Sequence, residues 1–149
     1  MCSTYIYSDS CTSCILLQPP SEEGSDPTSG VLSSPNFPHN YPLFSDCVWK
    51  LVAPKGYFIS LRFLSNVDIE DKLNCKYDYL DLFLLNSQGE QLADNSHLCG
   101  SLHASQLNSA LSGNTELQTQ AVVVHFHSDG TYIGTGFQLS YTLQGNKLL

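Results

Sequence analysis

Carboxylates gather in one short stretch of the sequence, residues 66–81, which reads NVDIEDKLNCKYDYLD. Two lysines, Lys72 and Lys76, offset its five acidic side chains only in part. Clustered carboxylates repel one another unless they face water or share a cation. Ca²⁺ takes six to eight oxygen ligands, so carboxylates brought close together can hold it. The stretch is therefore either a solvated loop or part of a cation site. Its acidic residues are Asp68, Glu70, Asp71, Asp78 and Asp81.

A pair of histidines forms a second candidate site. His125 and His127 are two residues apart in AVVVHFHSD (121–129), so they share one face of a strand, as zinc ligands sometimes do. The sequence suggests no third ligand near them, and we interpret the pair as ordinary histidines of a half-buried strand. No GxSxG or HExxH motif is present, and the cysteines look structural. We therefore expect no enzymatic activity.

The composition of the 149-residue chain narrows the classes of partner. A hydrophobic fraction of 42% with 13% charged residues is typical of a folded domain. The net charge of −8 disfavours nucleic acid and anionic membranes, and it favours cationic partners or metal ions. No apolar run reaches membrane-spanning length, so we expect no membrane insertion. Six cysteines indicate disulfides and a secreted, extracellular location, an inference made without a signal-peptide pattern.

Short strands are expected to position these groups. Gly, Pro and Asn turns separate the strands, and only residues 103–111 suggest a helical turn. The pattern predicts an all-β fold, an antiparallel two-sheet β-sandwich. We place Trp49, Tyr77 and Tyr79 in its core, with Asp78 pointing away from the two tyrosines. The alternative for the tyrosines is a place on the rim of a partner-binding surface. The expected strands lie in CVWKLVAP (47–54), YFISLRF (57–63), YDYLDLFLL (77–85), AVVVHFHSD (121–129) and GFQLSYTL (136–143).

The first 29 residues differ in composition from the rest of the chain. They end in QPPSEEGSDPTS (18–29), which is rich in Pro, Ser and acidic residues. Such segments form linkers more often than strands. We predict a poorly ordered N-terminal extension or linker over 1–29, one domain over 30–144, and a tail over 145–149.

Blocks of residues between 30 and 144 resemble those of a CUB domain, and they follow the order of that family. The resemblance implies a secreted, jelly-roll-like β-sandwich that mediates binding and is not itself catalytic. The matching blocks are GVLSSPNFP (30–38), YP (41–42), DCVW (46–49), VDIE (67–70), CKYDYL (75–80), LCG (98–100), FHSD (126–129) and GF (136–137).

The resemblance also implies a metal site. Many CUB domains bind calcium through three acidic residues, and the matching positions here are Glu70, Asp78 and Asp129. The implied function is a calcium-binding module for protein–protein recognition, in which a Lys or Arg of an extracellular partner reaches these carboxylates. Two alternatives stay open. One is a structural or carbohydrate-binding, spermadhesin-like module with a weak or vacant site, and the other is an accessory domain of a larger secreted protease.

One disulfide follows from the resemblance. Cys75 and Cys99 match the second pair of the family. Closing a loop of that length stabilises the fold by about 3 kcal/mol in the chain-entropy account. We therefore expect this bond to brace the acidic stretch.

The other cysteines depart from the family pattern. Cys47 matches one half of the first family disulfide, but no cysteine lies a few residues before Gly30, where its partner is expected. Cys14 is the nearest candidate and Cys11 is the next. We predict a Cys14–Cys47 pair, and we leave Cys2 to bond Cys11 or to link to another chain.

Overall fold

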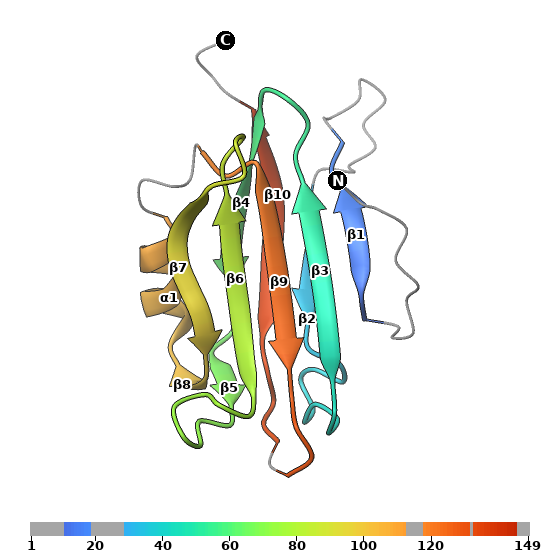
Figure 1. Ribbon diagram of the computed structural model, residues 1–149, viewed down its shortest axis with the longest axis vertical. Helices are drawn as coiled ribbons and strands as arrows, with labels where there is room; N and C mark the ends of the chain where they lie inside the picture. Colours follow the sequence, from blue (N-terminus) through green and yellow to red (C-terminus); the bar gives the residue numbers. More distant parts are fainter. Residues whose placement is uncertain (1–10, 19–28, 113–117, 132, 146–149) are drawn as a thin grey trace.

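The computed structural model describes residues 11–18, 29–112, 118–131 and 133–145. Over these residues the chain forms ten strands and one helix, arranged as two packed layers of strands (Figure 1). The elements are β1 (Ser13–Leu16), β2 (Ser29–Ser33), β3 (Asp46–Val52), β4 (Tyr57–Phe63), β5 (Val67–Ile69), β6 (Tyr79–Leu85), β7 (Gln91–Leu98), β8 (Gly100–Leu102), α1 (Ala104–Leu111), β9 (Ala121–His127) and β10 (Gln138–Gly145).

Two sheets make up the layers. The five-stranded sheet has the order β1-β3-β9-β6-β7, and the three-stranded sheet has the order β2-β10-β4. Their pairs are antiparallel except for β1 and β3, which run parallel. A two-stranded ribbon of β5 and β8 lies at one end. The predicted β-sandwich is therefore confirmed, and the ribbon and the parallel strand are additions to it.

The core lies between the two sheets, where alternate residues point inward. Val122, Val124 and Phe126 of β9 are fully buried, as their alternation predicts. The Phe126 ring packs 5.6 Å from the Phe137 ring, and the Trp49 ring meets Phe137 edge-on at 5.9 Å. Burying side chains of this size contributes about 1.5–3 kcal/mol each. The core assignment of Trp49 is confirmed.

Strand β1 was missed by the sequence analysis. It pairs with β3 from Ser13↔Trp49 to Leu16↔Val52, so this part of the predicted 1–29 extension belongs to the sheet. The Val48 N–H donates a 3.2 Å hydrogen bond to the hydroxyl oxygen of Thr12, the residue just before β1, and so fixes the start of this strand on β3. The rest of the predicted linker (1–10 and 19–28) and the tail beyond 145 lie outside the described residues. Within the described residues, no helix is long and apolar enough to span a membrane.

The predicted Cys14–Cys47 disulfide is wrong, because Cys47 bonds Cys11 (Cα–Cα distance 5.3 Å). The parallel register explains the difference. It places Cys14 opposite Lys50, and extending it back along both strands places residue 11 opposite residue 47. Cys14 is itself in a disulfide. The suggested Cys2–Cys11 pair is also wrong, because Cys11 bonds Cys47; Cys2 itself lies outside the described residues.

Helix α1 forms where the sequence suggested only a helical turn. Its Asn108 side chain makes two bonds to the backbone of Phe63 at the end of β4: the amide oxygen accepts from the N–H (2.7 Å) and the amide nitrogen donates to the carbonyl (3.0 Å). Leu111 at its end is buried. The helix thereby covers the end of β4, which strand alternation alone does not reveal.

Candidate metal centre

The three acidic residues predicted to bind metal converge at one end of the sandwich. Glu70 directly follows β5, Asp78 directly precedes β6, and Asp129 lies two residues after β9. These strand ends meet at the lower end of the molecule in Figure 1. One carboxylate oxygen from each residue lies within 4.8 Å of the others. The structure thus brings together all three predicted residues, although 59 positions of sequence separate the first from the last.

A tightly reversing loop joins Glu70 to Asp78. The Cys75–Cys99 disulfide (Cα–Cα distance 5.5 Å) ties this loop to the start of β8. Leu73, Asn74 and Cys75 all have positive φ, at 51°, 57° and 65°. Such left-handed conformations cost about 1–2 kcal/mol for each residue with a side chain. The loop therefore needs external support, which the disulfide provides, and it returns the chain so that Asp78 faces Glu70.

The Tyr41 hydroxyl links two members of the cluster. It donates to Asp78 Oδ2 over 2.7 Å and accepts the Glu70 N–H over 3.2 Å. The Tyr41 ring is fully buried and meets the Phe126 ring edge-on at 5.0 Å. The sequence analysis gave this residue no role. The sequence offers only a general indication of the role of Tyr41, because any buried tyrosine hydroxyl needs a hydrogen-bond partner.

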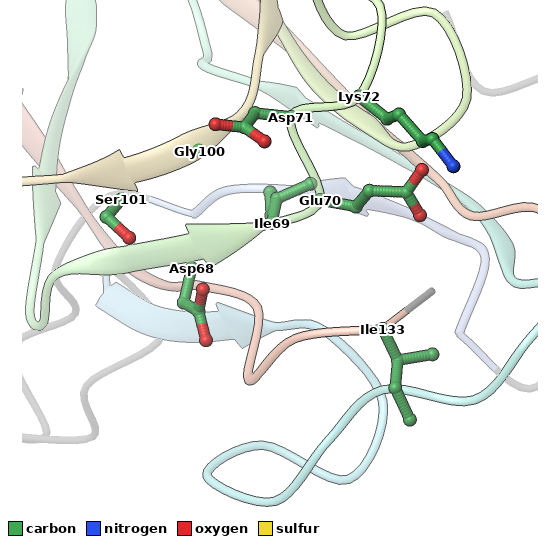
Figure 2. Close-up of a pocket in the computed structure, with 8 residues that line it drawn as sticks. All are labelled: Asp68, Ile69, Glu70, Asp71, Lys72, Gly100, Ser101 and Ile133. Carbon is green, nitrogen blue, oxygen red and sulfur yellow. The ribbon is translucent and has the colours of Figure 1, made fainter. Parts of the chain in front are cut away.

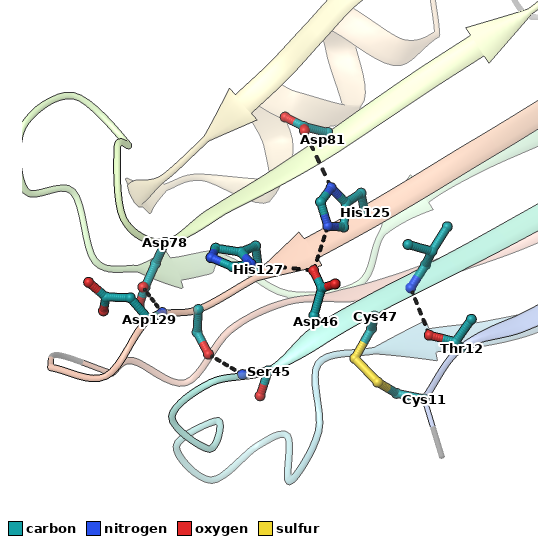
Figure 3. A network of polar contacts seen from close by, with 12 residues as sticks. Cys11, Thr12, Ser45, Asp46, Cys47, Asp78, Asp81, His125, His127 and Asp129 are labelled. Carbon is teal, nitrogen blue, oxygen red and sulfur yellow. Dashed lines mark hydrogen bonds and ion pairs between the residues drawn. A yellow bond between two sulfur atoms is a disulfide. The ribbon is translucent and has the colours of Figure 1, made fainter. Parts of the chain in front are cut away.

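The loop after β9 holds Asp129 in place. The Asp129 N–H donates to Asp78 Oδ1 over 2.8 Å (Figure 3), and the Thr131 N–H and hydroxyl donate to Asp129 Oδ1 over 3.2 and 3.1 Å. The Phe44 N–H donates to the Asp129 carbonyl over 3.0 Å. The Phe44 ring lies so close to Gly130 that a Cβ there would stand 2.4 Å from it. Each carboxylate oxygen of Asp78 therefore has a donor, and Asp129 is oriented by its own loop.

Burial governs the electrostatics of the cluster. It raises the pKa of Asp78, and the nearby charge of Asp129 raises it further, while the hydrogen bonds from Tyr41 and the Asp129 N–H lower it in part. Asp78 has no exposed surface, and both carboxylate oxygens of Glu70 are shielded from solvent. Burial also raises the pKa of the Tyr41 phenol well above its usual range, so the hydroxyl keeps its proton as a donor. A cation among these oxygens would remove the cost of keeping the carboxylates ionised.

The donor set fits Ca²⁺. All three side chains supply hard carboxylate oxygens, which calcium prefers, and no nitrogen or sulfur ligand belongs to the cluster. The remaining acidic residues of the stretch have other neighbours. Asp68 Oδ2 accepts the Thr135 N–H and hydroxyl over 3.2 and 3.3 Å, and Asp71 is exposed to solvent. Glu70, Asp78 and Asp129 therefore converge, and Asp68 and Asp71 lie outside their cluster.

Two hollows open beside the cluster, with Lys72 on the border of both. The first, of about 340 Å³, contains Glu70 and has Ile133 on its rim (Figure 2). The second, of about 590 Å³, contains Asp129. It also contains Tyr77, which the sequence analysis assigned to the core; that assignment is wrong, because the ring borders a surface hollow. The first hollow is lined by Asp68, Ile69, Glu70, Asp71, Lys72, Gly100, Ser101 and Ile133.

Comparison with known proteins identifies the family. Residues 22–141 match the CUB domain profile. The chain belongs to the CUB family. Over 117 residues it is 35% identical to cubilin of Rattus norvegicus, covering 78% of the chain and 3% of cubilin. Over 121 residues it is 30% identical to human mannan-binding lectin serine protease 1, covering 80% of the chain and 15% of the protease.

Solved CUB structures share the fold. The crystal structure of the MASP-1 CUB2 domain bound to Ca²⁺ superposes with a TM-score of 0.55 at 22% identity, covering 89% of this chain and 99% of that one. This likeness confirms the β-sandwich. The chain spans only a small part of the relatives named above, so it corresponds to one module of proteins that are much longer.

Proposed function

We propose that this CUB domain is a calcium-dependent recognition module of the extracellular space. In this proposal, Glu70, Asp78 and Asp129 bind Ca²⁺ and engage a basic side chain of a partner protein. The observation that carries the proposal is the convergence of three carboxylates around the fully buried Asp78. A buried carboxylate is costly without a cation or full hydrogen bonding. Bound calcium would supply the positive charge that keeps the three carboxylates ionised together.

The site is organised before any ligand binds. Tyr41 and the Asp129 N–H hold the two oxygens of Asp78, and Thr131 holds Asp129. Ligands that are already oriented lose little conformational entropy on binding, which favours affinity. The disulfide at Cys75 restrains the loop that carries Asp78 toward Glu70. These contacts support a built site rather than a solvated acidic loop.

The surface around the cluster suits a long basic side chain. The hollow that contains Glu70 is lined mainly by acidic side chains among its charged residues, and the whole chain carries a net charge of −8. Three exposed apolar residues lie on the neighbouring loops: Phe44 (77% exposed), Leu73 (62%) and Ile133 (43%). The methylene stem of Lys or Arg packs on apolar surface while its charged head reaches carboxylates, and such charge-assisted bonds are short and directional. We expect the partner to present such a residue within an apolar contact surface.

Calcium binding is tested by isothermal titration of the chain at neutral pH. We expect one site per chain, and we expect Asp129→Asn to weaken it by at least about tenfold, the loss of one charged ligand costing upward of 1.4 kcal/mol. Glu90→Gln is the matched control, because Glu90 is an exposed acid in the β6–β7 turn. Binding that is equally strong in both variants, or absent from the wild type at millimolar calcium, would contradict the proposal.

The basic partner is tested with polylysine as the probe, using acetylated polylysine as its control. Physiological salt screens the non-specific attraction between this acidic chain and the polylysine cation, and added calcium would weaken that attraction further. A specific site behaves in the opposite way: calcium should increase retention of the wild type and of Glu90→Gln, but not of Asp129→Asn. Retention that falls on addition of calcium would leave the metal site in place and refute the basic-ligand role.

A further inference from the structure

A second group of metal-ligating side chains lies on the outer face of the five-stranded sheet. Asp46 begins β3, and His125 and His127 lie near the end of β9, which pairs with it so that Asp46 is directly opposite His127. His125 Nε2 is 2.7 Å from Asp46 Oδ1, and His127 Nδ1 is 3.3 Å from the same oxygen (Figure 3). The sequence analysis found no third ligand for the two histidines, and the antiparallel register supplies it.

The donor atoms lie near the separations found around a small transition metal, and a bound ion would widen the 2.7 Å hydrogen-bond distance between His125 Nε2 and Asp46 Oδ1. Ligand atoms at about 2.0–2.2 Å from a tetrahedral zinc lie about 3.3 Å from one another. One atom from each of the three side chains already lies within 4.8 Å of the others. Two imidazoles and one carboxylate suit Zn²⁺ and its neighbours in the first transition row, whereas calcium avoids nitrogen. The cluster is therefore chemically distinct from the three-carboxylate cluster at the end of the sandwich.

Neighbouring groups orient the two imidazoles. Asp81 is only 5% exposed, and its Oδ2 faces His125 Nδ1 at 3.8 Å. Without a metal, His125 Nε2 carries the proton that it shares with Asp46 Oδ1 over 2.7 Å. A metal on Nε2 would move the ring proton to Nδ1, which faces the Asp81 carboxylate. The Asp81 carboxylate is held in turn by His97, through both the backbone N–H and the ring nitrogen at 2.9 Å.

Tyr79 completes the support. Its ring stacks on His97 (centroids 4.1 Å apart, planes 5° apart) and on His127 (5.2 Å, 26°). The sequence analysis placed Tyr79 in the core, which is wrong, because its ring lies among the histidines on the outer face. A ring wedged between two imidazoles restricts their rotation, so His127 is held where it meets Asp46.

We propose that Asp46, His125 and His127 form a Zn²⁺-class metal site, separate from the three-carboxylate cluster, with open coordination positions. The three side chains are 59%, 27% and 38% exposed, so the site is reachable from solvent. Three protein ligands leave at least one position of a tetrahedral ion for water or for a donor atom from another molecule. The site thus provides a second point on this domain where a metal can join it to a partner.

The test is a competition titration of the full chain with ZnCl₂ against a chromophoric zinc chelator, in saturating calcium. We expect one equivalent to bind, and His125→Gln and His127→Gln each to weaken binding by at least about tenfold. His103→Gln is the matched control, because His103 is an exposed histidine before α1. Asp129→Asn should keep its zinc affinity. That result separates this site from the calcium proposal, so that either proposal can fail alone.

A second measurement needs no variant. In imidazole ¹H–¹⁵N spectra of the wild type, zinc should shift the ring signals of His125 and His127 and leave those of His39 and His103 in place. Zinc affinity unchanged by either glutamine variant, shifts confined to other histidines, or no binding at 100 times the chain concentration would each overturn the proposal. The unfolding temperature of each variant without zinc shows whether a lower zinc affinity comes from the lost ligand or from a lost fold. Where a histidine variant does not fold, Asp46→Asn, at an exposed position, replaces it as the ligand variant in the titration.

Discussion

Replacing Tyr41 by Phe removes a single oxygen atom and tests whether its hydroxyl supports the carboxylate cluster. The buried ring and its edge-on contact with Phe126 remain, while the hydroxyl that bridges Asp78 and Glu70 is lost. A hydrogen bond to a charged group is worth about 1.5–3 kcal/mol, and leaving the Glu70 N–H unpaired costs about another 1 kcal/mol. The variant should therefore be less stable by about 2.5–4 kcal/mol. For a chain of this length that lowers the unfolding midpoint by about 10 °C.

The assay is urea unfolding followed by Trp49 fluorescence, in EGTA and again in saturating calcium. Tyr141→Phe is the control, because Tyr141 is also buried but its hydroxyl lies against Gly30 rather than a carboxylate. We expect that variant to change stability by less than about 1 kcal/mol. Calcium affinity should also fall in Tyr41→Phe, because Asp78 loses one of the groups that orient it. Equal stability of the two tyrosine variants would refute the bridging role.

Two further predictions concern the same end of the molecule. The raised pKa of Asp78 means that, in EGTA, the folded state binds this proton more tightly than the unfolded state does. The resulting stabilisation of the fold is complete below the ordinary pKa of the side chain, and it is lost as pH rises through the folded-state pKa. Relative to Asp78→Asn, the wild type should lose unfolding free energy as pH rises above about 4, the ordinary pKa of the side chain, as measured by urea unfolding; a flat difference would contradict the burial argument. Gly134→Ala should destabilise the fold by about 1–3 kcal/mol, because its Cβ would stand 2.4 Å from the Asp68 carbonyl oxygen, which is backbone and cannot move aside. Gly130→Ala should cost less, because the atom it meets belongs to the exposed Phe44 ring, and thermal unfolding of the two alanine variants gives the comparison.

The sequence predicted the sandwich well because strand alternation is a local property. In β9, the residues at 122, 124 and 126 point inward as their pattern indicates, and no distant contact is needed to see this. Strand alternation cannot predict that Glu70, Asp78 and Asp129 converge, because these residues come from three separate strand ends. The resemblance to CUB domains supplied that non-local information, and the structure places the three together.

Register was the quantity that the sequence could not supply. Asp46 becomes a neighbour of His127 only because β3 and β9 pair at that position, and a shift by one residue would turn its side chain to the other face. The same holds for Cys47, which meets Cys11 because β1 pairs in parallel with an offset of 36 residues. Pairing depends on the whole sheet, so composition and spacing around one residue do not contain it.

The two cation clusters share two chain segments, the start of β6 and the end of β9. Asp78 and Asp129 belong to the end of the sandwich, while Tyr79 and His127, one and two residues away, belong to the outer face of the sheet. Asp78 and Tyr79 are successive residues and point in opposite directions, while Asp129 lies in the loop beyond the end of β9, so each segment serves both surfaces without sharing a ligand. The clusters also differ in donor chemistry, oxygen alone in one and imidazole nitrogen in the other. Because of this difference in donor atoms, calcium should bind the carboxylate cluster and zinc the cluster of two histidines and Asp46. A partner that contacts both metal ions would have to approach the edge where β6 begins and β9 ends.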